Sequence, residues 1–172
     1  MAVKLKTPLS EKDVLSLKAG EVIYLSGTIY TARDSAHRKI LSLPPEELPF
    51  DPEGAVIYHC GPVVRETRGG YEVVSAGPTT SARMNRYLDG ILSLGIRGII
   101  GKEGMDTEPF KGRAVYFAFT GGAGALAAKS IKRVKAIHWL EELGIPAAVW
   151  ILEVRNFPLI VAIDAHGNSL YR

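Results

Sequence analysis

The residues of this sequence that could do chemistry gather in four short turns. Each turn joins an apolar run to small residues that are followed by hydroxyls or a cation, and the turns span residues 27–33, 77–83, 101–102 and 120–124. In α/β proteins, turns of this kind lie beyond the carboxyl ends of the strands, where ligands usually bind. Helix N-termini there offer free backbone N–H groups and the positive end of a dipole. The pattern therefore predicts a site for an anion.

The first turn runs into a segment that contains Arg33, Asp34 and His37. An arginine fork can bind both oxygens of a carboxylate, and His37 is the histidine that we expect to orient this loop. The alternative is purely structural, with Arg33 and Asp34 forming a local ion pair beside a helix N-cap. The spacing alone does not separate these two interpretations.

The second turn places Thr79 and Arg83 four residues apart, at the start of a predicted helix. On a helix this spacing puts both side chains on one face, so a hydroxyl and a guanidinium could contact the same small ligand. A threonine N-cap with a surface arginine is the structural alternative. In the third turn, Lys102 lies between Gly101 and Gly104. An ammonium group in a tight loop has little structural purpose, so we expect Lys102 to bind the ligand.

The fourth turn contains Gly121, Gly122 and Gly124. It has neither the lysine–hydroxyl pair of a phosphate-binding loop nor the glycine spacing of a dinucleotide-binding fingerprint. We interpret it as a helix start that needs close backbone approach. The alternative is that Gly121 and Gly122 contact a ligand or a partner.

The other reactive side chains show no pattern of metal binding or nucleophilic catalysis. The histidines lack metal-ligand spacing with carboxylates, and no serine stands in a nucleophile elbow. Cys60 is the one cysteine of the sequence, and a single thiolate cannot hold a zinc ion or an iron–sulfur cluster. We expect Cys60 to be a small buried residue near a strand end. Glu153, at another strand end, would either balance a buried cation or act as an acid.

The elements that must position these turns follow from hydrophobic periodicity and from glycine and proline breaks. Strands are predicted at 21–26, 55–59, 96–100, 114–119, 147–154 and 159–163, with a hairpin that joins 63–64 to 71–75. Helices are predicted at 10–20, at about 34–41, from the second turn to 92, and at 125–143, the first with a weak capping box of Ser10 and Asp13. The sequence thus predicts one α/β domain of mixed strands over residues 1–172.

The bulk properties of the chain fit a globular protein and argue against several classes. Apolar residues form 47% of the 172 residues, and no apolar run approaches the roughly 20 residues of a membrane helix. The opening segment has no apolar signal core, so we expect a cytoplasmic protein. The net charge is +3. Its densest basic group, within 129–135, would form a solvated helix face, and no nucleic-acid-binding motif is present. A modest positive balance suits an anionic substrate.

Read together, the segments 25–37, 77–83 and 101–102 resemble the β subunit of class I fumarate hydratase. The same pattern forms the C-terminal domain of single-chain members and the small subunit of L-tartrate dehydratase. The likeness extends to 120–122 and to the ending 153–171, so it covers nearly the whole chain. The arginine–aspartate–histidine segment is its specific part, whereas isolated glycine pairs are not specific.

The resemblance implies a swivelling β/β/α domain that closes on a larger α subunit, forming a hetero-oligomer. In that family the α subunit carries a four-iron four-sulfur cluster on three cysteines and leaves one iron open as a Lewis acid, so this chain would bind no metal. By position, Arg33, Arg83 and Lys102 match the cations that bind a small dicarboxylate. Thr79 matches a threonine near the carbon that gains or loses a proton. The implied reaction is the reversible hydration of fumarate to L-malate, a step of the tricarboxylic acid cycle.

Two other functions stay open. L-Tartrate dehydration would use the same cations on a substrate with an extra hydroxyl, and the contacts that discriminate the substrates would lie on the partner. A stand-alone anion-binding or regulatory module would keep the cations without catalysis, although the intact set of cations and Thr79 counts against such decay.

Overall fold

The computed structural model describes residues 2–119 and 124–171. Its strands are β1 (Val3–Lys6), β2 (Val22–Thr31), β3 (Val56–Tyr58), β4 (Val63–Thr67), β5 (Gly70–Ser75), β6 (Gly98–Gly101), β7 (Val115–Ala118), β8 (Ile131–His138) and β9 (Val149–Ile163). Its α-helices are α1 (Glu11–Ser16), α2 (Asp34–Ser42), α3 (Asn85–Leu92), α4 (Gly124–Ser130) and α5 (Leu140–Leu143), with 3-10 turns η1 (Pro45–Glu47), η2 (Ser81–Met84) and η3 (Glu108–Phe110). Within these ranges no helix combines the length and the apolar character needed to cross a membrane.

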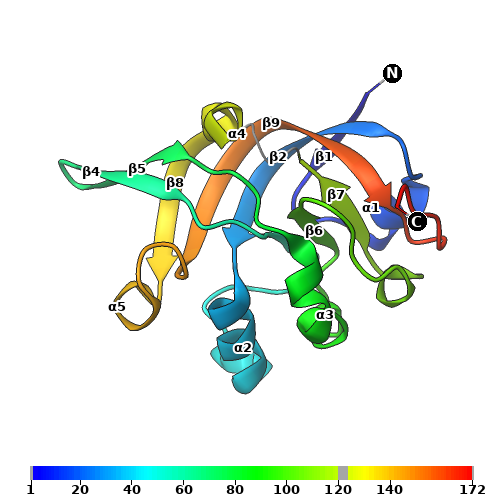
Figure 1. The fold of residues 1–172 in the computed structure, drawn as a ribbon, viewed down its shortest axis with the longest axis horizontal. Helices are drawn as coiled ribbons and strands as arrows, with labels where there is room; N and C mark the ends of the chain where they lie inside the picture. Colours follow the sequence, from blue (N-terminus) through cyan, green and yellow to red (C-terminus); the bar gives the residue numbers. More distant parts are fainter. Residues whose placement is uncertain (1, 120–123, 172) are drawn as a thin grey trace.

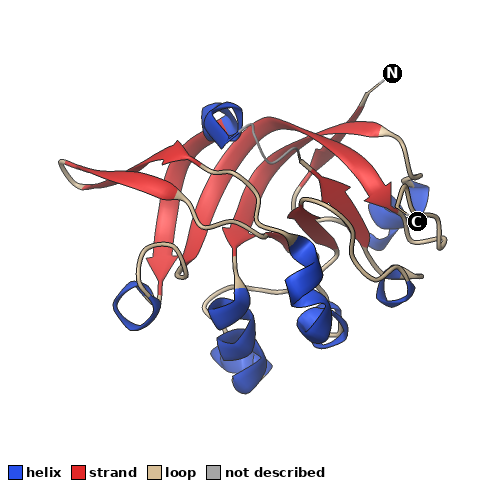
Figure 2. Ribbon diagram, viewed as in Figure 1, coloured by secondary structure: helices blue, strands red, loops and turns tan. Residues whose placement is uncertain are grey.

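The sheet is mixed and strongly curved, with helices around it (Figures 1 and 2). Seven strands pair in the order β1-β2-β3-β6-β7-β9-β8, and β4 and β5 form a separate hairpin. The first five of these strands run parallel to one another, while β9 runs antiparallel to β7, β8 and β2. Because β2 pairs with both β3 and β9, the pairings β2-β3-β6-β7-β9 form a closed ring. The predicted α/β fold with a mixed sheet is confirmed.

Alternating side chains of the central strands divide the core in two. Ile57 of β3 packs in one cluster with Ile40 of α2 and Leu88 of α3. Its neighbour Tyr58 packs in the other cluster, which includes Val14 of α1 and residues of the β4–β5 hairpin. Figure 1 shows α2 and α3 side by side below the sheet, and the two helices contact each other. The loops that enter these two helices therefore lie close together.

The long helix predicted over 125–143 is wrong. Helix α4 ends at Ser130, and the chain continues as strand β8, which pairs antiparallel with β9. Two register shifts interrupt this pairing, and Ile131, Val134 and Ile137 pack toward the core at every third position. That spacing resembles the period of a helix, which is why the local pattern was misleading. Lys132, Arg133 and Lys135 thus lie on the outermost strand rather than on a helix face, and charge there discourages pairing with another chain. Lys129 lies on α4.

Other elements differ less from the prediction. The hairpin and the capping box of Ser10 and Asp13 are confirmed. Strand β2 continues past the predicted stop at 26, with a register shift at Gly27, where φ is +111°. The two strands predicted at 147–154 and 159–163 are one strand, β9, and Asn156 within it has a φ of 51°.

Candidate functional site

The carboxyl ends of the parallel strands β2, β3 and β6 meet at one edge of the sheet, and the loops beyond them carry most of the predicted site residues. We call this group the polar edge. It comprises Arg33, Asp34 and His37 after β2, His59 after β3, Thr79, Ser81 and Arg83 before α3, and Lys102 after β6. In Figure 1 it lies where β2 leads into α2, beside the start of α3.

Backbone contacts join the loops of the polar edge. The N–H of Thr79 donates to the carbonyl oxygen of His59 over 2.7 Å, and the N–H of Ser81 donates to the carbonyl oxygen of Lys102 over 3.2 Å. Thr80 and Lys102 also form a parallel bridge. The segment 79–83 therefore lies between the loops that follow β3 and β6, and three turns that are distant in the sequence become neighbours.

The ion pair at the polar edge differs from the Arg33–Asp34 pair that the sequence analysis considered as one of two alternatives. Asp34 pairs with Arg83, whose Nη2 lies 3.1 Å from its Oδ1, rather than with the adjacent Arg33. The exposed fraction of the side chain is 49% for Arg83 and 38% for Asp34. Such exposed pairs contribute only about 0–1 kcal/mol to stability. The pair matters for geometry, since it holds the second turn against the first.

Arg33 stands at the N-cap position of α2, partly buried beside Gly61. A Cβ at position 61 would lie 2.7 Å from Nη1 of Arg33 and 2.8 Å from the carbonyl oxygen of Pro146, so glycine is required for this approach. The Nε of Arg33 is buried and has no hydrogen-bond partner among the described residues. Leaving such a donor unpaired costs about 1–3 kcal/mol, which makes this guanidinium a candidate contact for a bound anion.

The predicted helical face of Thr79 and Arg83 is wrong. Thr79 precedes the 3-10 turn η2, and α3 begins only at Asn85. Pro78 bridges Cys60, and the backbone of Thr79 and Thr80 pairs with neighbouring loops, so these residues are extended rather than helical. Tertiary contacts, and not helical spacing, bring Thr79 and Arg83 to the same edge.

Two buried histidines belong to the polar edge, and their ring centroids lie 5.1 Å apart. Burial lowers the pKa of His37, and the Arg33 carbonyl and Asp34 offset part of this effect. Burial lowers the pKa of His59 well below its usual value, and His37 and Arg83 lower it further. Both rings are therefore neutral near pH 7. His37 lies 2.7 Å through Nδ1 from the carbonyl oxygen of Arg33, so Nδ1 carries the proton and donates it.

His59 and Ser81 were missed by the sequence analysis. Both side chains are fully buried and bonded to each other. The available signal was position, because His59 directly follows a buried strand and Ser81 lies inside the second turn. Cys60 is buried as expected, and burial raises the pKa of its thiol to about 12, against an opposing effect of Arg33. The thiol is accordingly inert near neutral pH.

The fourth turn is described only at its end. Gly121 and Gly122, predicted as a helix start or a contact point, lie outside the described residues. Gly124 begins α4, and its carbonyl oxygen accepts a hydrogen bond from the N–H of Ala76 over 3.1 Å. A Cβ at position 124 would lie 3.1 Å from the backbone nitrogen of Gly77. The end of the fourth turn therefore packs against the start of the second, as a helix start with close backbone approach requires.

Glu153 has neither of its predicted environments. It lies within β9 rather than at a strand end, and its Oε1 accepts a hydrogen bond from Nε of Arg133 over 2.6 Å. That hydrogen bond lowers the pKa of Glu153, and the pair is largely exposed to solvent. Glu153 thus belongs to a surface ion pair that joins β8 to β9.

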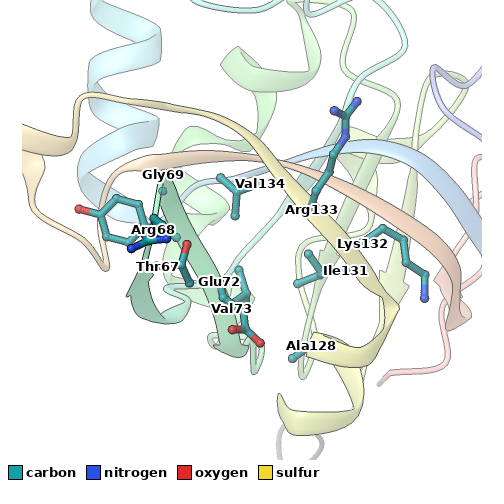
Figure 3. Close-up of a pocket in the computed structure, with 12 residues that line it drawn as sticks. Thr67, Arg68, Gly69, Glu72, Val73, Ala128, Ile131, Lys132, Arg133 and Val134 are labelled. Atoms are coloured by element: carbon teal, nitrogen blue, oxygen red, sulfur yellow. The ribbon is translucent and has the colours of Figure 1, made fainter.

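A second concave feature lies apart from the polar edge. A groove of about 530 Å³ runs between the β4–β5 hairpin and β8, and Figure 3 shows Arg68, Glu72, Lys132 and Arg133 around it. None of the polar-edge residues lines this groove. The chemistry-bearing side chains of the polar edge and this groove are therefore at different places.

Comparison with known proteins gives the family. The model of the fumarase C-terminus family matches residues 1–172, the whole chain. This chain belongs to the fumarase C-terminus family. The family membership agrees with the resemblance that the turns of the polar edge carry.

Relatives in the fumarase C-terminus family have names from two related activities. A protein of Methanocaldococcus jannaschii named "Putative L(+)-tartrate dehydratase subunit beta" is 50% identical over 95% of this chain and 88% of its own length. The L(+)-tartrate dehydratase subunit beta of Escherichia coli strain K12 is 40% identical over 96% of this chain and 85% of its own length. A protein of Geobacillus stearothermophilus named "Putative fumarate hydratase class I" is 39% identical over 98% of this chain, which spans 33% of that longer protein.

Proposed function

We propose that this chain is the β subunit of a hydro-lyase that adds water to, or removes it from, a four-carbon dicarboxylate. The observation that carries the proposal is the polar edge, where the segment of Arg83 contacts the loop of Lys102 through its backbone and the loop of Arg33 through the Asp34–Arg83 ion pair. The family match over the whole chain and the names of the relatives support the same reaction class. Our first candidate reaction is the reversible hydration of fumarate to L-malate.

In this proposal the cations bind the two carboxylates of the substrate. The planar forks of Arg33 and Arg83 suit carboxylate geometry, and Lys102 adds a point charge. Removing a proton beside a carboxylate builds negative charge on that carboxylate. Fixed cations aimed there stabilise the transition state, and losing one such group typically costs about a hundredfold or more in rate. Asp34 holds Arg83 in place through their 3.1 Å ion pair.

Thr79 is our candidate for the group near the carbon that gains or loses the proton. Its backbone is held by His59, and its loop adjoins Lys102. An alkoxide of threonine is hard to form at neutral pH, so Thr79 would act as a base only with help from another group. We assign that help to a carboxylate of the partner subunit.

We further propose that an α subunit holds the four-iron four-sulfur cluster of the assembled enzyme. Such clusters are held mainly by cysteine thiolates, whereas this sequence has one cysteine, the buried Cys60. The residues of this chain therefore do not fit the cluster. None of the steps that we assign to this chain involves the cluster. In the hetero-oligomer, residues 1–172 would form one swivelling domain that closes the polar edge on the partner. We place the complex in the cytoplasm, where free thiols are the norm.

The test uses this chain co-purified anaerobically with a cluster-bearing α subunit. We expect the pair to convert fumarate to L-malate and either chain alone to be inactive. Arg83→Ala should lower kcat/KM about a hundredfold or more, with an unchanged unfolding temperature. Arg86→Ala is the matched control, because Arg86 is an exposed arginine on α3 that lies over the Tyr87 ring. Near-normal turnover by Arg83→Ala would contradict the role of the polar edge.

The second candidate substrate is L-tartrate. The relatives at 50% and 40% identity have tartrate dehydratase in their names, which favours this substrate. The same cations would bind tartrate, with one more hydroxyl to accommodate. Steady-state kcat/KM values for fumarate, mesaconate and L-tartrate, measured on the same pair, decide between the two. No turnover of any diacid, together with retained diacid binding, would favour a non-catalytic anion-binding module instead.

A further inference from the structure

A chain of side-chain hydrogen bonds runs through the interior of the polar edge. Nδ1 of His59 lies 2.8 Å from Oγ of Ser81, and that Oγ lies 3.0 Å from the hydroxyl of Tyr116. The Tyr116 hydroxyl lies 2.7 Å from the carbonyl oxygen of Glu103. All three side chains are buried. The chain therefore connects the loop after β3, the second turn, strand β7 and the loop after β6.

The direction of each hydrogen bond follows from counting protons. The Glu103 carbonyl can only accept, so the Tyr116 hydroxyl donates to it. Tyr116 then has no proton left for Ser81, so the Ser81 hydroxyl donates to Tyr116. Ser81 in turn has no proton left for His59, so Nδ1–H of His59 donates to Ser81. The three hydrogen bonds use three protons. In this assignment His59 is the Nδ1–H tautomer, and its Nε2 is unprotonated.

The surroundings of these hydrogen bonds keep them buried and in place. A Cβ at position 101 would overlap Oγ of Ser81, so Gly101 at the end of β6 is needed for the serine to lie there. Burial raises the pKa of Tyr116, and the Ser81 bond opposes this effect in part, so the hydroxyl keeps its proton. Nε2 of His59 is buried without a hydrogen-bond partner among the described residues. Buried polar chains of this kind favour one arrangement of the groups that they connect.

We propose that Ser81 and His59 are positioning residues, which hold the segment from Thr79 to Arg83 between the loops after β3 and β6. This proposal rests on the proposed function for its effect on turnover. His59 holds the segment twice, through its carbonyl oxygen to Thr79 N–H and through Nδ1–H to Ser81. The backbone N–H of Ser81 also donates to the carbonyl oxygen of Lys102. The candidate base and two candidate cations thus depend on one buried serine for their spacing.

The first test is independent of turnover. Side-chain nitrogen NMR of the full chain at pH 7 should show His59 with a protonated Nδ1 and an unprotonated Nε2. The resonances are assigned by their loss in His59→Gln. In Ser81→Ala, Nδ1–H loses its acceptor, and we expect the His59 signals to shift toward a mixture of tautomers. A protonated Nε2 in the wild-type chain, or unchanged His59 signals in Ser81→Ala, would overturn the proposal.

The second test measures turnover of the complex with the α subunit. Misplacing a reacting group by about 1 Å can cost about a hundredfold, so Ser81→Ala should lower kcat tenfold to a hundredfold, with a smaller change in KM. Tyr116→Phe should lower kcat less than Ser81→Ala does. The double variant should have the kcat of Ser81→Ala, because that substitution alone already breaks the series of hydrogen bonds. Ser93→Ala is the control, since Ser93 is an exposed serine that caps its own helix through Asp89.

The outcomes separate this proposal from the proposed function. If the wild-type complex turns over no diacid, the proposed function fails. The tautomer of His59 still decides whether the buried series of hydrogen bonds exists. If the complex is active and Ser81→Ala keeps the wild-type kcat, the proposed function stands and the positioning role is wrong. If Ser81→Ala does not fold, Tyr116→Phe and the NMR of the wild-type chain carry the decision.

Discussion

At the scale of single residues, the polar edge depends on small residues as much as on its cations. Gly61 lets the guanidinium of Arg33 pass close to the backbone, and Gly101 lets Ser81 lie against the end of β6. Neither glycine has a positive φ. Each is required because a Cβ at its position would lie too close to a neighbouring side chain. A methyl group at either position would displace a polar side chain of the polar edge.

The residue-scale prediction concerns Gly61. Gly61→Ala should lower kcat/KM of the complex, or the affinity for a diacid, by about tenfold or more, because the new methyl group pushes Arg33 away. Gly70→Ala is the control, since no atom lies within 4 Å of a Cβ built there. Equal kinetics for the two variants would mean that Arg33 does not need its present position.

At the scale of elements, the end of β2 is held by β9 as well as by β3. Oγ1 of Thr31 accepts a hydrogen bond from the N–H of Trp150 over 2.9 Å and lies 3.4 Å from the carbonyl oxygen of Ala148. Thr31 is fully buried and lies two residues before Arg33. The start of β9 thus fixes the strand end from which the first turn departs.

The element-scale prediction is that Thr31→Val lowers the free energy of unfolding by about 1–3 kcal/mol, because the N–H of Trp150 loses its acceptor in the interior. Urea unfolding followed by tryptophan fluorescence measures the change. Thr67→Val, at an exposed end of β4, should change stability by less than about 0.5 kcal/mol. A Thr31→Val protein as stable as the wild type would show that this contact does not hold the strand end.

At the scale of the whole molecule, neutral buried histidines couple folding to pH. His37 and His59 have pKa values lowered from 6.5 in the folded chain, chiefly by burial. In the unfolded chain both titrate near 6.5. Below that pH the unfolded state binds more protons than the folded state, so stability is present above about pH 6.5 and is lost as the pH falls.

The molecule-scale prediction concerns how much of the free energy of unfolding is lost as the pH falls. Between pH 6.5 and the folded-state pKa values, the free energy of unfolding should fall by up to about 1.4 kcal/mol per pH unit for each histidine. Urea unfolding at pH 7.5, 6.5 and 5.5 measures the slope, and His59→Gln should make it shallower. Carboxylates such as Asp164 add their own loss only nearer to pH 4, because hydrogen bonds, outweighing burial, lower the pKa of Asp164. A stability that does not change from pH 7.5 to 5.5 would contradict the prediction.

The sequence by itself determined the α/β class, most strand and helix positions, and the turns that carry Arg33, Thr79, Arg83 and Lys102. These features depend on short-range signals, namely side-chain alternation and the placement of glycine and proline. Only the tertiary structure decided that residues 131–138 are a strand, because their spacing suits a helix and the pairing partner, β9, lies elsewhere in the chain.

Tertiary structure alone also decided which residues of the site are neighbours. The pairing of Asp34 with Arg83 and the bond between His59 and Ser81 join segments that are 49 and 22 residues apart. No local pattern encodes such contacts, because they depend on the register of β2, β3 and β6, which the sheet sets as a whole. The residues of the candidate site were therefore readable from the sequence, whereas their arrangement became readable only when the strands were paired.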